Sequence, residues 1–194
     1  MDPRADVSGM YEVEIKVRAD HEAVRERLAE LDADRQERVR QVDTYFDAPH
    51  REFAETDEAL RVRRVRAPDD GAGEEDARIT YKGPLLDAES KSREEFETGV
   101  DEGATATEIF ERLGFEAAAT VEKDRERYEL AGYDVTLDAV DGLGEFVEVE
   151  TERETDDIAE ARDGARDLLG DLGLDADEQI RTSYLGLLLA EKDV

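Results

Sequence analysis

The segment from Tyr11 to Arg18 alternates apolar and charged side chains, and its charged face could do chemistry. Two carboxylates are followed there by two cations: Glu12, Glu14, Lys16 and Arg18. Strict alternation over eight residues is typical of a β-strand with two unlike faces. Carboxylates beside cations suit a metal ion and a polyanion held side by side, although a solvent-exposed strand would show the same pattern.

A second set of carboxylates falls on later strand-like segments. Glu148 and Glu150 lie two residues apart, and Asp138 lies one strand earlier. Residues two apart on a strand point to the same face, so each glutamate pair could reach one hard cation. Oxygen ligands without sulfur or convergent histidines suit Mg²⁺ or Mn²⁺ better than zinc. One pair alone could be a solvated face, but two pairs and a basic set together favour a metal site.

The remaining pattern predicts about eight short strands, arranged with four helices in one α+β domain over residues 1–194. The strands are expected at residues 11–18, 39–47, 59–66, 78–82, 92–98, 121–128, 133–138 and 145–152. Helices are expected after Asp20, around Ile109, from about Ile158 and from about Tyr184. Thr105 and Glu108 have the spacing of a capping box for the second helix, and residues 68–76 read as a solvated loop. Most gaps between strands are too short for parallel crossovers, which predicts antiparallel pairing.

The charged strand faces differ from the rest of the chain, which has a net charge of -29. Their basic members outnumber their acidic members, so the excess of acid lies elsewhere. The basic members are Lys16, Arg18, Arg61, Arg63, Lys82, Arg93, Lys123, Arg125 and Arg127, and the acidic ones are Glu12, Glu14, Glu95, Glu97, Asp138, Glu148 and Glu150.

The simplest arrangement of eight such faces is a closed antiparallel β-barrel with helices packed outside. Eight strands leave an interior just wide enough for side chains or one small ligand. Crowded cations in such a lumen need an anion, and clustered carboxylates need a metal. The sequence therefore predicts a ligand with several phosphates, bound together with Mg²⁺ or Mn²⁺. Arginine would grip phosphate oxygens in bidentate fashion and lysine would act as a point charge. For any one of these cations taken alone, a surface ion pair is the simpler explanation.

Composition limits the remaining classes of function. Of the 26 basic residues only five are lysines, and such an arginine-rich, strongly acidic chain favours a surface adapted to high salt. Phosphate repels an acidic exterior, so nucleic-acid binding is not expected. The chain has no cysteine, and its N-terminal residues do not include the apolar region that a secretory signal needs. We therefore expect a cytoplasmic protein. His21 and His50 receive no role, and neither a nucleophile motif nor a phosphate-binding glycine loop is present.

At these residues the chain resembles the CYTH superfamily, the triphosphate tunnel metalloenzymes. The opening EVEIK at residues 12–16 has the form of that family's ExExK signature. The resemblance continues in order through QVDTYFD (41–47), ALRVR (59–63), TYKGP (80–84), SREEFE (92–97), KDR (123–125), LD (137–138), GLGEFVEVE (142–150) and SYL (183–185). This ordered set covers nearly the whole chain and looks nearest to the CyaB branch, the class IV adenylate cyclases.

The resemblance implies an eight-stranded antiparallel tunnel that binds a triphosphate. It implies metal ligands at Glu12, Glu14, Asp138, Glu148 and Glu150, and phosphate ligands at Lys16, Arg61, Arg63, Lys82, Arg93, Lys123 and Arg125. It also implies a class IV adenylate cyclase-like reaction, from ATP to cyclic AMP and pyrophosphate, and a homodimer is common in that branch. Two alternatives stay open: a triphosphatase acting on inorganic triphosphate, thiamine triphosphate or another organic triphosphate, and a non-catalytic polyphosphate-binding module.

Overall fold

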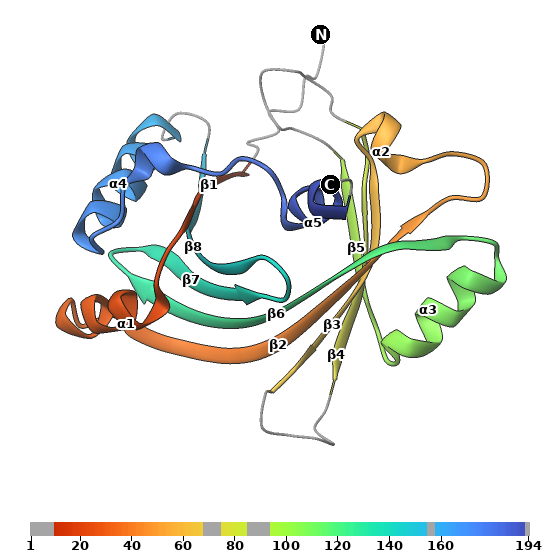
Figure 1. Cartoon of the computed structure of the whole chain (residues 1–194), viewed down its shortest axis with the longest axis horizontal. Coiled ribbons are helices and arrows are strands. Elements are labelled where there is room, and N and C mark those ends of the chain that lie inside the picture. Colours follow the sequence, from red (N-terminus) through yellow and green to blue (C-terminus); the bar gives the residue numbers. More distant parts are fainter. Residues whose placement is uncertain (1–9, 68–74, 85–93, 155–157, 193–194) are drawn as a thin grey trace, which may run out of the picture. The chain divides into compact units, whose positions relative to one another are not determined.

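The structure is a computed structural model that describes residues 10–67, 75–84, 94–154 and 158–192 (Figure 1). Its strands are β1 (Met10–Arg18), β2 (Asp34–Asp47), β3 (Ala59–Arg66), β4 (Asp76–Lys82), β5 (Glu95–Val100), β6 (Glu116–Leu130), β7 (Tyr133–Val140) and β8 (Gly144–Glu154). Its helices are α1 (His21–Glu30), α2 (Phe53–Thr56), α3 (Gly103–Arg112), α4 (Ile158–Asp171) and α5 (Tyr184–Lys192), with a 3₁₀ turn at Ala176–Glu178.

The eight strands form one sheet in the order β1-β8-β7-β6-β2-β3-β4-β5. The pairs β2–β3, β3–β4 and β4–β5 are antiparallel, as expected from their short connections, and β1 also pairs antiparallel with β8. The prediction of a closed barrel is wrong: β1 and β5 end the order, and no pairing joins them in the part of the chain that the structure describes. Side-chain alternation reports which residues share a face, whereas closure depends on strand tilt and stagger that alternation does not encode.

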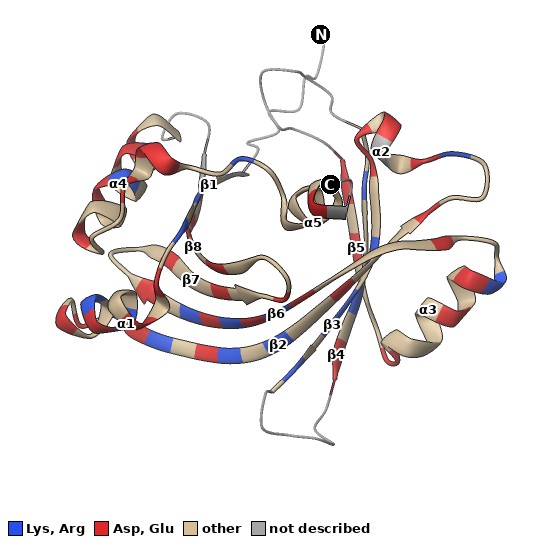
Figure 2. Cartoon of the chain, viewed as in Figure 1, with Lys and Arg blue, Asp and Glu red and all other residues tan. Residues whose placement is uncertain are grey.

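The chain divides into two compact units, each made of several segments. Unit 1 comprises Met1–Glu37, Arg125–Ala139 and Gly144–Thr182, and unit 2 comprises Arg38–Asp124, Val140–Leu143 and Ser183–Val194. A single domain over residues 1–194 stays a prediction. Many of the basic residues lie along β2, β3 and β6, whereas acidic residues also crowd the helices (Figure 2).

Unit 1 has a core built from β1, β7 and β8 with helices α1 and α4. Ile15, Val17, Val147 and Val149 are buried there with Leu169 of α4. The face of β1 that carries its apolar residues is therefore the buried face, as the alternation predicts. Helix α1 begins where expected, because the Asp20 carboxylate accepts hydrogen bonds from the backbone N–H groups of residues 22 and 23 at 2.8 and 3.3 Å. This core fixes the face of β1 and β8 that carries the carboxylates.

Unit 2 has a separate core, in which α3 packs against β3 and β4 (Figure 1). The predicted capping box is wrong, since α3 begins at Gly103 with Glu102 as its N-cap, and the Thr105 hydroxyl donates to the Glu102 carboxylate at 2.6 Å. A side chain at position 103 would lie 2.6 Å from Cγ of Arg64. Glycine at that position therefore lets the first turn of α3 approach β3 closely.

No helix in the described ranges is long and apolar enough to cross a membrane. The expected cytoplasmic location stays a prediction.

Candidate metal and phosphate sites

The carboxylates predicted to bind a metal meet on β1 and β8 of unit 1. The antiparallel register sets Glu14 opposite Glu150 and Lys16 opposite Glu148. Oxygen atoms of Glu14, Glu148 and Glu150 all lie within 4.8 Å of one another. Lys16 Nζ lies 3.8 Å from Glu148 and 4.0 Å from Glu14. Both Lys16 and Glu148 are only 4% exposed, whereas Glu14 is exposed. The group is thus buried at its base and open to solvent at Glu14.

Asp138 and Arg125 form an ion pair beside these carboxylates. Two Arg125 nitrogens donate to Asp138 at 2.6 and 2.5 Å, and Arg125 also donates to Glu148 at 2.6 Å. Burial alone would lower the pKa of Arg125, but the hydrogen bonds and charges of Asp138, Glu148 and Glu150 outweigh burial and raise the pKa well above its ordinary value. Asp138, which is fully buried, therefore holds Arg125 and does not join the three carboxylates that meet.

We call these six residues the acidic cluster: Glu14, Lys16, Arg125, Asp138, Glu148 and Glu150. Four carboxylates and two cations give the acidic cluster a net charge of minus two. Its donors are carboxylate oxygens, the type that Mg²⁺ and Mn²⁺ prefer. Charge and donor chemistry thus both fit one divalent cation. Glu12 lies on β1 opposite Glu152, and its side chain lies outside the described part of the structure.

Unit 2 contains a charged group that sequence reasoning did not identify. Asp43 of β2 is 3% exposed and accepts hydrogen bonds from Arg63 Nε at 2.7 Å and Arg63 Nη2 at 2.8 Å. Arg61 Nη1 lies 3.7 Å from the same carboxylate, and the Gln41 amide donates to it at 3.0 Å. The two arginines were predicted as phosphate ligands, but the carboxylate between them was not.

The charges around Asp43 keep it ionised. Burial would raise its pKa, but the hydrogen bonds of Arg63 and the charges of Arg63, Arg61 and Lys123 outweigh burial and hold the pKa below its ordinary value. We call Asp43, Arg61, Arg63 and Lys123 the basic group. One carboxylate and three cations give the basic group a net charge of plus two, which suits an anion.

Further contacts in unit 2 hold the other predicted phosphate ligands. Arg61 Nε donates to the Thr80 hydroxyl at 3.4 Å, and that hydroxyl donates to Glu97 at 2.8 Å. Lys123 is 4% exposed, and its Nζ lies 4.9 Å from the ring centroid of Tyr184 on α5. Such a contact stabilises a buried ammonium.

Lys82 is less buried and lies 3.0 Å from Glu95. Arg93 lies outside the described residues. Two other cations of the charged strand faces have local partners in unit 1: Arg18 stacks 4.7 Å from the Phe146 ring, and Arg127 forms a fork with Asp134 at 3.0 and 2.8 Å.

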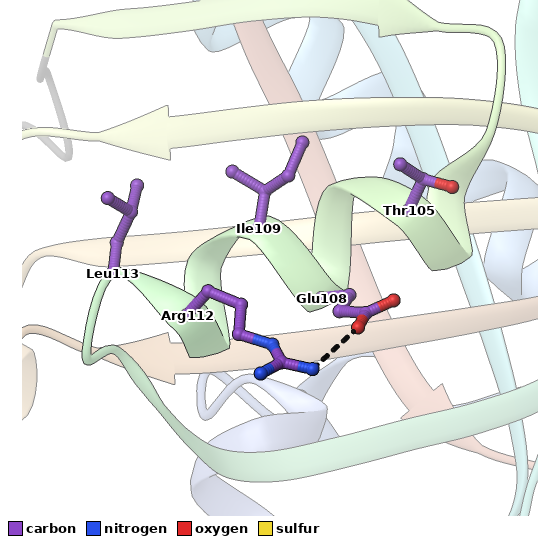
Figure 3. A pocket seen from close by; sticks show the side chains of 5 residues that line it. All are labelled: Thr105, Glu108, Ile109, Arg112 and Leu113. Carbon is purple, nitrogen blue, oxygen red and sulfur yellow. Dashed lines mark hydrogen bonds and ion pairs between the residues drawn. The ribbon is translucent and has the colours of Figure 1, made fainter.

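A shallow pocket lies on the surface of α3, apart from every predicted site residue. Thr105, Ile109 and Leu113 line it with Glu108 and Arg112, which form an ion pair at 3.1 Å (Figure 3). Ile109 and Leu113 are 53% and 64% exposed. Its apolar lining comes from Ile109 and Leu113, and its two charged residues pair with each other. The pocket therefore lacks the convergent charges that a phosphate or metal needs.

The acidic cluster and the basic group have the charge and donor chemistry that suit a divalent metal and a phosphate compound, respectively. The chain matches the CYTH domain over residues 10–184, and it belongs to that family. A protein of Methanocaldococcus jannaschii named as a candidate adenylate cyclase is 37% identical over 185 residues, which cover 92% of this chain and 98% of that protein.

Solved structures agree with this membership. The PH1819 protein of Pyrococcus horikoshii is 38% identical, with a TM-score of 0.77 over 93% of this chain and 99% of that one. A Hippeastrum protein, described as a candidate adenylyl cyclase with a dominant triphosphatase activity, is 18% identical with a TM-score of 0.64, and the match covers 93% of this chain and 96% of that one. At 18% identity the Hippeastrum protein shares the fold alone.

Proposed function

We propose that this protein is a divalent-metal-dependent enzyme that acts on a triphosphate, with a class IV adenylate cyclase-like reaction as the best-supported activity. One observation carries the proposal. Glu14, Glu148 and Glu150 bring carboxylate oxygens within 4.8 Å of one another, beside the buried ammonium of Lys16. The acidic cluster has four carboxylates against two cations, and this excess of negative charge, partly buried at Glu148 and Asp138, is costly without a counter-ion. A divalent cation would neutralise that excess, and a polyphosphate bound to the cation would lie beside Lys16, which already pairs with Glu148 and Glu14.

Each set of residues has a distinct role in this proposal. Glu14, Glu148 and Glu150 would hold Mg²⁺ or Mn²⁺, with Glu12 as a further ligand that the family resemblance implies. The resemblance also implies Asp138, which in this structure holds Arg125. A divalent ion held there would polarise phosphoryl oxygens and lower the pKa of a nearby nucleophile. The proposed phosphate ligands are Lys16, Arg61, Arg63, Lys82, Arg93, Lys123 and Arg125. Their charges neutralise the phosphate oxygens, and positioning with neutralisation supplies most of the catalysis in such displacements.

In the cyclase reaction, the ribose 3′-oxygen of ATP attacks the α-phosphorus. The bond from that phosphorus to the bridging oxygen breaks, and pyrophosphate leaves. The hydroxyl proton passes to solvent or to a phosphate oxygen, so the reaction needs no histidine base. The similarity to the Methanocaldococcus jannaschii protein, over nearly the whole of both chains, supports this activity.

A triphosphatase is the second candidate. Water would then attack the terminal phosphorus, and the same residues would neutralise the leaving group. A Hippeastrum protein of the same fold, described as having a dominant triphosphatase activity, shows that the fold is compatible with this reaction. The two reactions differ in the nucleophile and in the phosphorus that it attacks, and fold does not fix that choice.

A product assay separates these activities. The assay uses purified protein in molar KCl, because the sequence predicts a surface adapted to high salt. Mg²⁺ or Mn²⁺ is added with either ATP or inorganic triphosphate. Cyclic AMP and pyrophosphate, lost in Glu148→Gln, would establish the cyclase. Orthophosphate from triphosphate without cyclic AMP would establish the triphosphatase, and binding without turnover would contradict both and leave a polyphosphate-binding module.

A further inference from the structure

Asp43 is an unexpected residue in a group of phosphate-binding cations. Its carboxylate is 3% exposed, and it engages two of the five N–H donors of Arg63 in a bidentate fork. Arg61 lies 3.7 Å away, and the buried Gln41 side chain donates a hydrogen bond to the same carboxylate at 3.0 Å. Asp43 therefore lies at the centre of the basic group and is itself held in place.

A negative charge at this position has two opposing effects on an incoming phosphate. By simple electrostatics it repels the phosphate, and it removes one unit from the net charge of the basic group. By geometry it fixes the plane of the Arg63 guanidinium, which would otherwise explore several rotamers on a flexible stem. These two effects predict opposite results when the charge is removed.

We infer that Asp43 is a positioning residue, which orients the Arg63 and Arg61 guanidinium groups for the oxygens of a triphosphate. The inference rests on the proposed function, because it assumes that the ligand is a polyphosphate. The β2–β3 register supports it, since Asp43 lies directly opposite Arg63 across the strand pair. The backbone of two adjacent strands thus fixes both partners of the fork, as a residue that orients a binding group requires.

The test compares triphosphate binding in Asp43→Asn and in the wild type. Calorimetry with inorganic triphosphate in EDTA prevents metal-dependent turnover, and KCl is set at the lowest concentration at which circular dichroism shows folded protein. We expect Asp43→Asn to bind at least about tenfold more weakly, although it gains one unit of positive charge. Binding that is equal or tighter would overturn the inference, because charge would then outweigh positioning.

The matched control is Asp141→Asn. Asp141 is also in unit 2 and forms an ion pair with an arginine, Arg40, at 2.6 Å, but it is not a member of the basic group. The two variants change the net charge equally. Unchanged affinity in Asp141→Asn is expected, and an equal loss there would show that any broken ion pair in unit 2 weakens binding and would overturn the inference.

A double-mutant cycle tests whether Asp43 acts through Arg63. In an Arg63→Gln background, Asp43→Asn should weaken binding by clearly less than it does in the wild type. An equal loss in both backgrounds would overturn the inference, since a purely structural effect would not depend on the arginine.

Two further results are readily distinguished. If Asp43→Asn does not fold, Gln41→Leu replaces it in the test. This variant keeps the charges of Asp43 and Arg63 but removes the hydrogen bond that holds Asp43, so it should weaken triphosphate binding about two- to threefold. Unchanged affinity would overturn the inference. Wild-type protein that does not bind triphosphate would overturn the proposed function, and the inference with it, before any variant is compared.

Discussion

The acidic cluster of unit 1 and the basic group of unit 2 are built from the same kinds of residue but carry opposite excess charge. Each contains a fork between a half-buried arginine and a buried aspartate, Arg125 with Asp138 and Arg63 with Asp43. In unit 1 the arginine is surrounded by carboxylates, and in unit 2 the aspartate is surrounded by cations. The net charges of minus two and plus two suit a divalent metal and a phosphate, respectively. From this comparison we propose that the excess charge around a fork, rather than the fork itself, selects the ligand.

Removing a carboxylate from the acidic cluster is expected to have the largest effect. Glu148→Gln should lower turnover by on the order of a thousandfold or more, because Glu148 contacts Lys16 and Arg125 and is one of the three carboxylates that meet. The product assay measures this loss. Glu160→Gln, an exposed position on α4, is the matched control and should keep wild-type activity. Activity of Glu148→Gln within about tenfold of wild type would contradict the metal role.

Changing an arginine of the basic group is expected to have a smaller effect. Arg63→Lys keeps the charge but loses the planar fork, so triphosphate affinity should fall by about ten- to a hundredfold. Calorimetry in EDTA gives the affinity. Arg112→Lys on α3, which is 79% exposed in its side chain, should leave affinity unchanged. If Arg63→Lys also bound triphosphate normally, charge alone would suffice and the bidentate geometry would have no role.

Metal removal should produce a moderate change in stability. At a hundred times its dissociation constant, a bound ion stabilises the folded state by about 2.7 kcal/mol, so Mg²⁺ or Mn²⁺ should raise the melting temperature by several degrees relative to EDTA. Thermal unfolding in fixed KCl measures the shift. Glu148→Gln should abolish the shift and Arg63→Lys should retain it. A shift of equal size in both variants would mean that the ion binds elsewhere.

The pH dependence of stability should show the smallest effect, from Asp43. Because its pKa is held below the ordinary value, Asp43 stabilises the folded state fully above the unfolded pKa of about 3.9, and this contribution is lost as pH falls through the lower folded pKa. Denaturant unfolding at a series of pH values down to the acid limit of folding measures the slope. Asp43→Asn should lose less stability than wild type in this acid range, and an identical slope would contradict the pKa direction.

Much of the fold could be predicted from the sequence. The eight strands alternate strongly enough to be counted, and Ala59–Arg66 was predicted at its observed bounds. The start of β2 and both ends of β6 were missed. At the start of β2, residues such as Arg35 and Glu37 leave no apolar parity to follow. The four-residue helix α2 is too short for a helical period. Sheet closure was predicted wrongly, since it depends on strand geometry rather than on alternation.

The candidate sites divide in a similar way. Glu14, Glu148 and Glu150 could be predicted, because i and i+2 positions share a strand face and both pairs are acidic. Asp43 was missed because its partner Arg63 lies 20 residues away in sequence. The ion pair can be recognised only from the β2–β3 register, which places Asp43 directly opposite Arg63. Register carries information about ion pairs that parity within one strand does not contain.

The most direct test of the assignment of metal to the acidic cluster and phosphate to the basic group is to measure the binding of each ligand to one variant of each group. Calorimetry would follow Mn²⁺ binding without phosphate, and triphosphate binding in EDTA, for wild type, Glu148→Gln and Arg63→Lys. We predict that Glu148→Gln loses Mn²⁺ and keeps triphosphate, whereas Arg63→Lys keeps Mn²⁺ and binds triphosphate more weakly. If each variant lost both ligands equally, or if Glu148→Gln bound Mn²⁺ like wild type, the assignment of metal to the acidic cluster and phosphate to the basic group would be wrong.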